Sequence, residues 1–132
     1  MKSIDWEKLF AAAELARQHA YAPYSQYSVG AAVLTTDGAV FAGCNVENAS
    51  YGLTVCAERN ALAACVLAGK RPRAVTIVVD GKRPASPCGA CRQVLAELCS
   101  PNTPVRSRTK SSKPKSFTVK SLLPAAFSPS DL

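Results

Sequence analysis

The sequence predicts an α/β domain built as a three-layer α/β/α sandwich around one mixed β-sheet. Helix-like and strand-like segments follow one another in the order α-β-β-α-β-α, a pattern typical of layered α/β folds. The segment Ala74–Val79 is a nearly continuous run of β-branched residues, so we expect a strand covered on both faces. The chain has 132 residues, which suits a single domain spanning residues 1–132 and allows a core without disulfides.

The first part of the chain is predicted to be a helix followed by a β-hairpin. Apolar residues recur at three- and four-residue spacing over Ile4–Ala20, where Lys8 and Arg17 are free to face water. An Asp-Gly pair, a strong hairpin signal, separates the two predicted strands, Ser28–Leu34 and Ala39–Asn45.

In the second part of the chain, one predicted helix precedes the buried strand and another follows it. These helices are Cys56–Ala68 and Pro87–Leu98, the latter with its proline near the first helical position. The pattern then weakens: Thr118–Val119 is a candidate strand and Lys120–Leu123 a candidate helical turn. Arg106–Lys115 is poor in apolar residues, and we expect a loop or an edge hairpin there.

The composition and the net charge bear on the cellular compartment of the protein and on whether it binds a membrane or a nucleic acid. The first residues lack the continuous apolar core of a signal peptide, and the apolar stretches are too short to cross a membrane, so we expect a cytoplasmic protein without a membrane partner. The net charge of +7 raises the possibility of nucleic-acid binding. Because the basic stretch Arg106–Lys115 has no aromatic residue for base stacking, we interpret it as a solvated surface feature without a specific nucleic-acid partner.

Two groups of cysteines, among six in all, indicate a metal site. Cys56 opens one predicted helix, and Cys88 and Cys91 form a C-x-x-C pair at the start of the next. Helix starts stabilise anions, so cysteines there ionise readily, and thiolates are the form that binds zinc. With a glutamate two residues after Cys56, the spacing matches the zinc-deaminase pattern of a ligand-x-Glu element followed by P-C-x-x-C. The sequence therefore predicts a Zn²⁺ cofactor.

The number of protein ligands separates a catalytic zinc site from a structural one. Three ligands leave a position for water, whereas four close the site. Cys56, Cys88 and Cys91 supply three, and we favour the catalytic type. A structural site needs a fourth protein ligand. Cys65 and Cys99 lie well along their predicted helices and are poorly placed for this role, as is His19 on a helical stretch. The position of Cys44 does not exclude it. The four candidates are Cys44, Cys65, Cys99 and His19.

Three charged residues lie beside the cysteines in the sequence. Glu58 is predicted to be the catalytic proton shuttle between water and the base, although a glutamate in a first helical turn can also simply complement the helix dipole. Three thiolates leave net negative charge, which weakens zinc as a Lewis acid. Arg59 and Arg92 each follow a cysteine group and can donate hydrogen bonds to thiolates. We favour Arg59 for this role and a surface ion pair for Arg92.

Four stretches of the sequence resemble the cytidine deaminases of nucleoside salvage: YAPYSQYSVGAAV, GCNVENASYGLTVCAERNA, SPCGACRQVLAE and LLPAAFSPSDL. With the segments between them, the resemblance covers nearly the whole chain, and it combines the zinc pattern with a separate sugar-binding motif. It implies a cytidine deaminase-like fold. It also implies zinc-dependent hydrolytic deamination of cytidine and deoxycytidine to uridine and deoxyuridine, with release of ammonia, in pyrimidine salvage.

The resemblance also implies roles for individual residues in binding the substrate. Asn45 and Glu47 would hold the ribose 3′-hydroxyl, although the sequence alone, without the resemblance, favours polar turn residues. The Ala57 amide would contact the pyrimidine carbonyl, and the region of Ser86 would meet the exocyclic amine. Tyr27 stands where the family commonly has a phenylalanine stacked on the base; its ring can still stack, but its hydroxyl needs a partner.

Short members of the family with three cysteine ligands are homotetramers whose sites lie at subunit junctions. Tyr51 and Phe127 match positions that reach toward a neighbour's site. The chain departs from the family after Thr103–Val105, where an apolar strand is usual and arginines alternate with polar residues instead. We therefore expect a short or irregular last strand and a basic surface beside it.

Three other functions share part of this pattern. A blasticidin deaminase uses the same zinc chemistry, but the sugar-binding motif and Arg59 favour a nucleoside. A polynucleotide cytosine deaminase is supported only by the net charge. A zinc module without enzymatic activity that docks on RNA would need neither the catalytic glutamate nor the sugar motif.

Overall fold

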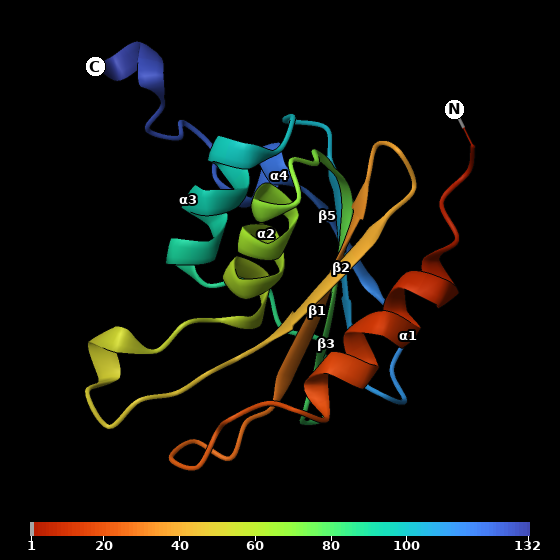
Figure 1. Ribbon diagram of the computed structural model, residues 1–132, viewed down its shortest axis with the longest axis vertical. Helices are drawn as coiled ribbons and strands as arrows, with labels where there is room; N and C mark the ends of the chain where they lie inside the picture. The colour runs from red at the N-terminus through yellow and green to blue at the C-terminus, as the bar shows by residue number, and fades with distance from the viewer. Residues whose placement is uncertain (1) are drawn as a thin grey trace.

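A computed structural model describes residues 2–132 and contains one five-stranded sheet with helices on both faces (Figure 1). The spatial order of the strands is β2-β1-β3-β4-β5. The strands are β1 (Val29–Thr35), β2 (Val40–Cys44), β3 (Pro72–Val79), β4 (Pro104–Arg108) and β5 (Lys115–Thr118). The helices are α1 (Trp6–Arg17), α2 (Ala57–Leu67), α3 (Gly89–Leu98) and the short α4 (Val119–Leu122), with single 3-10 turns η1 (Tyr51–Leu53) and η2 (Pro129–Asp131).

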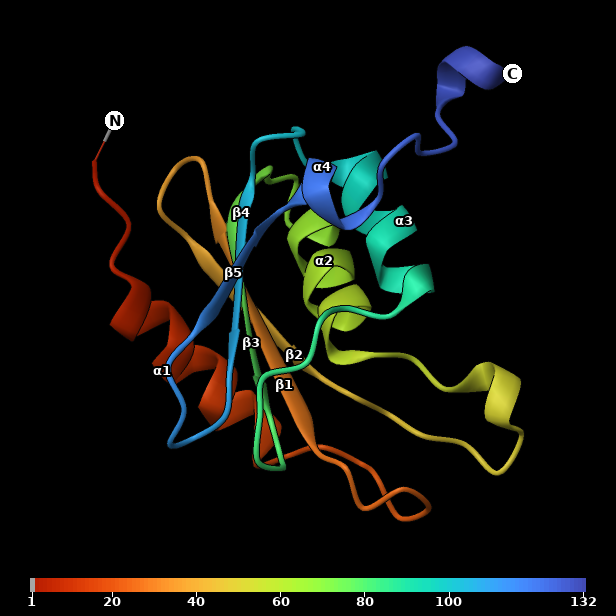
Figure 2. The same ribbon diagram turned by 180° about the vertical axis from the view of Figure 1, so that it is seen from behind.

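The sheet is mixed, as predicted. β3 and β4 are parallel, and the other neighbouring pairs are antiparallel. Helix α1 covers one face, while α2, α3 and α4 lie on the other, and Figure 2 shows the same layers from behind. The three-layer α/β/α sandwich is therefore confirmed. No helix within residues 2–132 has the length and apolar character needed to cross a membrane.

The core consists of two apolar layers on opposite faces of the sheet. Alternating residues of β3 point to the two layers, so Val75 and Ile77 face α2 and α3 while Ala74 and Val78 face α1. All six residues Ala74–Val79 are buried. The prediction of a strand covered on both faces is thus confirmed, because the period of two exposes neither side of this central strand to water.

Helix α1 is shorter than predicted, and one of its charged residues does not face water. Asp5 caps the helix by accepting a hydrogen bond from the Lys8 amide at 3.1 Å. The expectation that Arg17 faces water is wrong, because its side chain is only 14% exposed. Its guanidinium pairs with Glu14 at 2.7 Å and with Asp80, just beyond β3, at 2.5 Å.

The basic stretch forms part of the sheet and packs on α1. Residues 106–108 belong to β4, which pairs with β5 in the edge hairpin that was one of the two expectations. Arg106 lies over the Trp6 ring at 4.0 Å, and Arg108 lies over the Phe10 ring at 4.1 Å. The interpretation as a solvated surface feature therefore does not fit these two arginines, which pack on aromatic rings of α1. The candidate strand Thr118–Val119 is also displaced, since β5 ends at its first residue and α4 begins at its second.

We predict that Gly43→Ala destabilises the fold by pushing α2 away from β2. A Cβ atom at Gly43 would lie 2.5 Å from the Ala61 amide nitrogen and 2.9 Å from the Ala57 carbonyl oxygen. Overpacking of this kind should lower the free energy of unfolding by about 1–3 kcal/mol, measured by urea denaturation. Gly52→Ala is the control, because a Cβ atom there meets nothing within 4 Å. Equal stability of the two variants would contradict the close packing at Gly43.

Candidate active site

The starts of α2 and α3 bring three cysteine sulfurs together. Cys56 and Cys88 are the N-cap residues of the two helices, and Cys91 lies in the first turn of α3. The three sulfurs lie within 4.8 Å of one another, and those of Cys56 and Cys88 are 3.6 Å apart. The three cysteines expected to bind metal therefore form one cluster in space, although β3 lies between Cys56 and the other two in the sequence.

The donor set and spacing fit a zinc ion. With Zn–S bonds of about 2.3 Å, sulfurs at the corners of a tetrahedron stand roughly 3.8 Å apart. Within residues 2–132 this is the one group of three or more metal-binding side chains, and none of the four candidates for a fourth ligand joins it. The Cys65 thiol instead donates to the Lys70 carbonyl, and His19 is exposed. Three sulfurs and an open fourth position suit a catalytic site.

Charges around the sulfurs favour a thiolate at Cys56. A hydrogen bond with the Cys91 thiol, followed by those with Arg59 and Cys88, lowers the pKa of Cys56 to about 5 against the effect of burial. The same hydrogen bond with Cys56, together with burial, raises the pKa of Cys91. Arg59 Nη2 lies 3.6 Å from the Cys56 sulfur and 3.5 Å from the Thr54 carbonyl oxygen. Arg59 thus lies at the thiolates, where the sequence predicts it.

Glu58 is a buried carboxyl group at the start of α2. It is only 5% exposed, and this burial is the main reason that its pKa rises to about 7. The negative charge at Cys56 acts in the same direction, while Arg59 opposes it. A simple partner of the helix dipole would lie at the surface, whereas Glu58 faces a cavity beside the cysteine cluster.

The cavity beside the cysteines has a volume of about 280 Å³. Its wall contains five of the seven residues expected to bind substrate, namely Tyr27, Asn45, Glu47, Ala57 and Ser86, together with Cys56, Glu58 and Cys88. The remaining wall is formed by residues that the sequence did not single out: Ser25, Val29, Thr54, Ile77, Val79 and Ala85. Ser25 and Thr54 lie within the quoted motifs, but no local signal shows that they face the cavity.

Asn45 and Glu47 organise the loop that forms one side of the cavity. The buried Asn45 donates from Nδ2 to the Tyr27 carbonyl at 2.8 Å and accepts from the Val29 amide at 2.9 Å. The Glu47 carboxylate accepts from the amides of Tyr24 and Ser25 at 3.0 and 3.1 Å and from the Ser25 hydroxyl. Both residues therefore shape the site, in addition to any contact that they make with a substrate.

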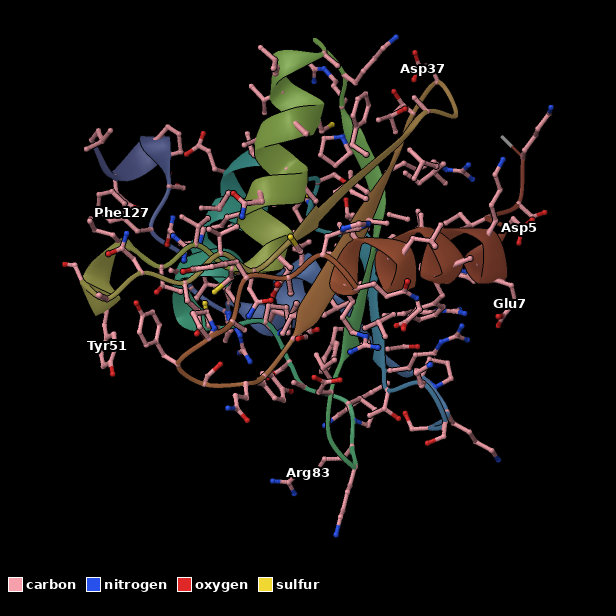
Figure 3. The ribbon with its side chains drawn as sticks, turned by 60° about the horizontal axis from the view of Figure 1, so that its bottom comes forward. Asp5, Glu7, Asp37, Tyr51, Arg83 and Phe127 are labelled. Atoms are coloured by element: carbon pink, nitrogen blue, oxygen red, sulfur yellow. The ribbon has the colours of Figure 1, made fainter. Side chains whose placement is uncertain are left out.

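Tyr51 and Phe127 lie outside this cavity. Tyr51 in η1 is 75% exposed, and Phe127 in the C-terminal segment is 61% exposed. Both side chains project from the periphery of the molecule in Figure 3. The Tyr51 ring pairs with that of Tyr24 at a centroid distance of 6.1 Å, beside a second hollow that shares Ser25, Glu47 and Thr54 with the cavity.

Both expectations for Arg92 are wrong. Its guanidinium contacts neither a thiolate nor an acidic residue in the described part of the chain. It donates instead to the carbonyls of Pro87 and Leu122 and to the Ser86 hydroxyl. Adjacency to Cys91 in the sequence is misleading here because successive residues of a helix point about 100° apart.

Comparison with known proteins identifies the family. Residues 3–106 match the family model described as the cytidine and deoxycytidylate deaminase zinc-binding region. The chain belongs to the cytidine deaminase family. The cytidine deaminase of Halalkalibacterium halodurans is 49% identical over 130 residues, which cover 98% of each protein. That of Sporosarcina psychrophila is 48% identical and covers 98% of this chain and 96% of the relative.

Solved cytidine deaminase structures confirm the fold. The enzyme from Burkholderia pseudomallei superposes with a TM-score of 0.89 at 48% identity, covering 94% of this chain and 100% of the other. The enzyme from Mycobacterium leprae gives a TM-score of 0.81 at 40% identity, covering 92% and 99%. The resemblance seen in the sequence motifs is therefore confirmed at the level of the family and its fold.

We predict that this cytidine deaminase family member binds one zinc ion per chain through its three clustered cysteines. Cys56→Ala should lose most of the zinc because only two sulfurs remain. Cys44→Ala, which removes a thiol outside the cluster, should keep it. Elemental analysis of the purified proteins measures the zinc content. Undiminished zinc in Cys56→Ala, or a stoichiometry near zero in the unmodified protein, would contradict this ligand set.

Proposed function

We propose that this protein is a zinc-dependent cytidine deaminase that hydrolyses cytidine and deoxycytidine to uridine and deoxyuridine with release of ammonia. The observation that carries the proposal is the placement of Glu58 in the same cavity wall as Cys56 and Cys88. A buried carboxyl group beside a three-sulfur metal site is the arrangement required for hydrolysis at a ring carbon. Curated relatives named cytidine deaminase support the choice of substrate.

Glu58 would move the protons of this reaction. Bound zinc would polarise a water molecule and lower its pKa toward about 7. The Glu58 carboxylate takes one proton from this water as the water oxygen forms a bond to C4 of the base, and it delivers that proton to N3. The second water proton then passes through Glu58 to the exocyclic amine. The C4–N bond breaks, ammonia leaves, and the C4 carbonyl of uridine forms.

The charge of the cavity favours a nucleoside over a nucleotide. The charged side chains in its wall, apart from any thiolate, are Glu47 and Glu58, and no lysine or arginine of residues 2–132 lines it. A 5′-phosphate would therefore enter without a cationic partner and beside a carboxylate. This argues for cytidine over deoxycytidylate, both of which fall within the family description. A polynucleotide substrate is disfavoured for a second reason. Arg106 and Arg108, which contribute to the basic charge, pack on aromatic rings of α1.

We assign five further residues of the cavity wall to substrate binding. Asn45 and Glu47 would hold the ribose 3′-hydroxyl at the loop that they already organise. The Tyr27 ring would stack on the base, the Ala57 amide would contact the pyrimidine carbonyl, and Ser86 would lie near the exocyclic amine. All five line the cavity, which supports these assignments.

We further propose that the protein is a homotetramer whose sites are completed across subunit interfaces. Exposed aromatic and aliphatic side chains on the loops around the cavity support this, among them Tyr21, Tyr24, Tyr51 and Leu53. Tyr51 and Phe127 do not reach the cavity of their own chain, so they are free to reach that of a neighbour. We place the reaction in cytoplasmic pyrimidine salvage, because a nucleoside substrate is what that route recovers.

A panel of cytosine compounds tests the substrate. Ammonia release should be efficient with cytidine and deoxycytidine and much slower with deoxycytidylate, blasticidin and a cytosine-containing oligonucleotide. The reason is that the cavity offers polar groups for a sugar but no cation for a phosphate. Faster ammonia release from deoxycytidylate, blasticidin or the oligonucleotide than from cytidine would instead indicate a deaminase specific for that compound.

We predict that Glu58→Gln keeps its fold and its zinc but loses activity. Glutamine preserves the shape of the side chain but cannot accept and pass on a proton. The loss of kcat should be about 10²–10⁴-fold or larger, because the residue acts twice. Steady-state kinetics and zinc analysis measure it, with Glu97→Gln on the exposed side of α3 as the control. Near-normal turnover in Glu58→Gln would rule out the proton-shuttle role.

We also predict that Phe127→Ala impairs turnover or assembly, although Phe127 lies far from the zinc ligands within its own chain. Its ring would be lost from a neighbouring site. Leu132→Ala is the matched control, since Leu132 is another exposed apolar residue of the C-terminal segment. Light scattering gives the oligomeric state beside the kinetics. A fully active monomer would overturn the shared-site arrangement.

A further inference from the structure

The Arg92 guanidinium connects three acceptors around the cysteine cluster. Nε donates to the Pro87 carbonyl at 2.7 Å, and Nη2 donates to the Ser86 hydroxyl at 2.8 Å. Nη1 donates to the carbonyl of Leu122, the last residue of α4, at 2.8 Å. Two acceptors thus belong to the segment that leads into Cys88, and the third lies 30 residues beyond Arg92 in the chain. Because a guanidinium is planar and rigid, one side chain fixes all three acceptors relative to one another.

The segment that carries Cys88 is anchored by the buried Pro87 and by Ala85, which packs against the core, but few side-chain hydrogen bonds hold it. It lies between β3 and α3, outside any helix or strand, and Ser86 and Cys88 are exposed. Pro87 has no amide hydrogen, and the Cys88 side chain makes no capping hydrogen bond. Among the described residues, the side-chain hydrogen bonds that reach residues 86–88 come from Arg92, apart from the contacts of the Cys88 sulfur with those of Cys56 and Cys91.

The C-terminal segment is held to α3 at a second point. Gln93, the residue after Arg92, donates from Nε2 to the Phe127 carbonyl at 2.9 Å. Arg92 and Gln93 therefore attach the chain beyond β5 to the helix that contains Cys91. Of the two, only Arg92 also bonds to the segment before Cys88, so the two side chains can be separated by mutation.

We propose that Arg92 is a positioning residue for the metal site. By tying Ser86 and Pro87 to the end of α4, it holds the Cys88 sulfur against those of Cys56 and Cys91 and keeps Ser86 in the cavity wall. The end of α4 thereby contributes to metal retention, although it supplies no ligand. This inference rests on the proposed function only in taking the three cysteines as the zinc ligands.

The rate of zinc transfer from the intact zinc-loaded protein to a chromogenic chelator tests the proposal. Loss of a group that orients a metal ligand typically weakens metal binding about 10–100-fold, and we expect Arg92→Met to release zinc faster by this factor. Arg92→Lys should be intermediate, because an ammonium group reaches only part of the acceptors. Gln93→Ala should release zinc at the wild-type rate. The KM for cytidine should rise in the order wild type, Arg92→Lys, Arg92→Met as Ser86 loses its partner.

A general loss of stability is controlled by Leu9→Ala, a core substitution on the opposite face of the sheet. If Leu9→Ala releases zinc as fast as the Arg92 variants, or if these release it at the wild-type rate, the proposal is overturned. Should Arg92→Met not fold, Arg92→Lys decides the matter at a temperature where circular dichroism shows it folded. A wild-type protein that binds no zinc would instead overturn the proposed function, which keeps the two failures distinct.

Discussion

The meeting of two helix starts at one end of the sheet is the constraint on which the site depends. The starts of α2 and α3 direct the positive ends of two helix dipoles toward the same three sulfurs. This lowers the cost of gathering cysteines that must all ionise to bind a divalent metal. The close approach of α2 to β2, where Gly43 leaves no space for a side chain, fixes one of these starts. Arg92 donates hydrogen bonds to Ser86 and Pro87, just before the other start.

The charge balance explains why two arginines next to cysteine ligands have different functions. With zinc bound, three thiolate charges would be balanced by the divalent ion and by the guanidinium of Arg59, which lies 3.6 Å from the Cys56 sulfur. A second cation at the sulfurs would leave the cluster with net positive charge and would compete with the metal for the thiolates. Arg92 is therefore available to bind carbonyl groups, and its place is decided by its partners in α4 and in the loop before Cys88.

Local patterns in the sequence predict most of the helices and strands, and the cysteine spacing predicts the metal cluster. Residues near one another in the chain control these features, since the ligands are placed by helix starts that are themselves local signals. The cavity wall is different. The bond from Asn45 to the Tyr27 carbonyl and the bonds from Glu47 to the loop at Ser25 join segments about 20 residues apart. No periodicity or turn signal specifies such pairs, and only the resemblance to a family pointed to their roles.

The arginines of β4 show how basic side chains can take part in packing a helix on a sheet. On β4, Arg106 and Arg108 occupy positions that face α1, where a sheet interior normally has apolar side chains. The planar guanidinium stacks on Trp6 or Phe10 and the aliphatic stem covers the strand, so each arginine fills the space that an apolar residue would. Glu7 pairs with the exposed edge of one of them. The basic composition of the strand therefore contributes to the packing of α1 on the sheet.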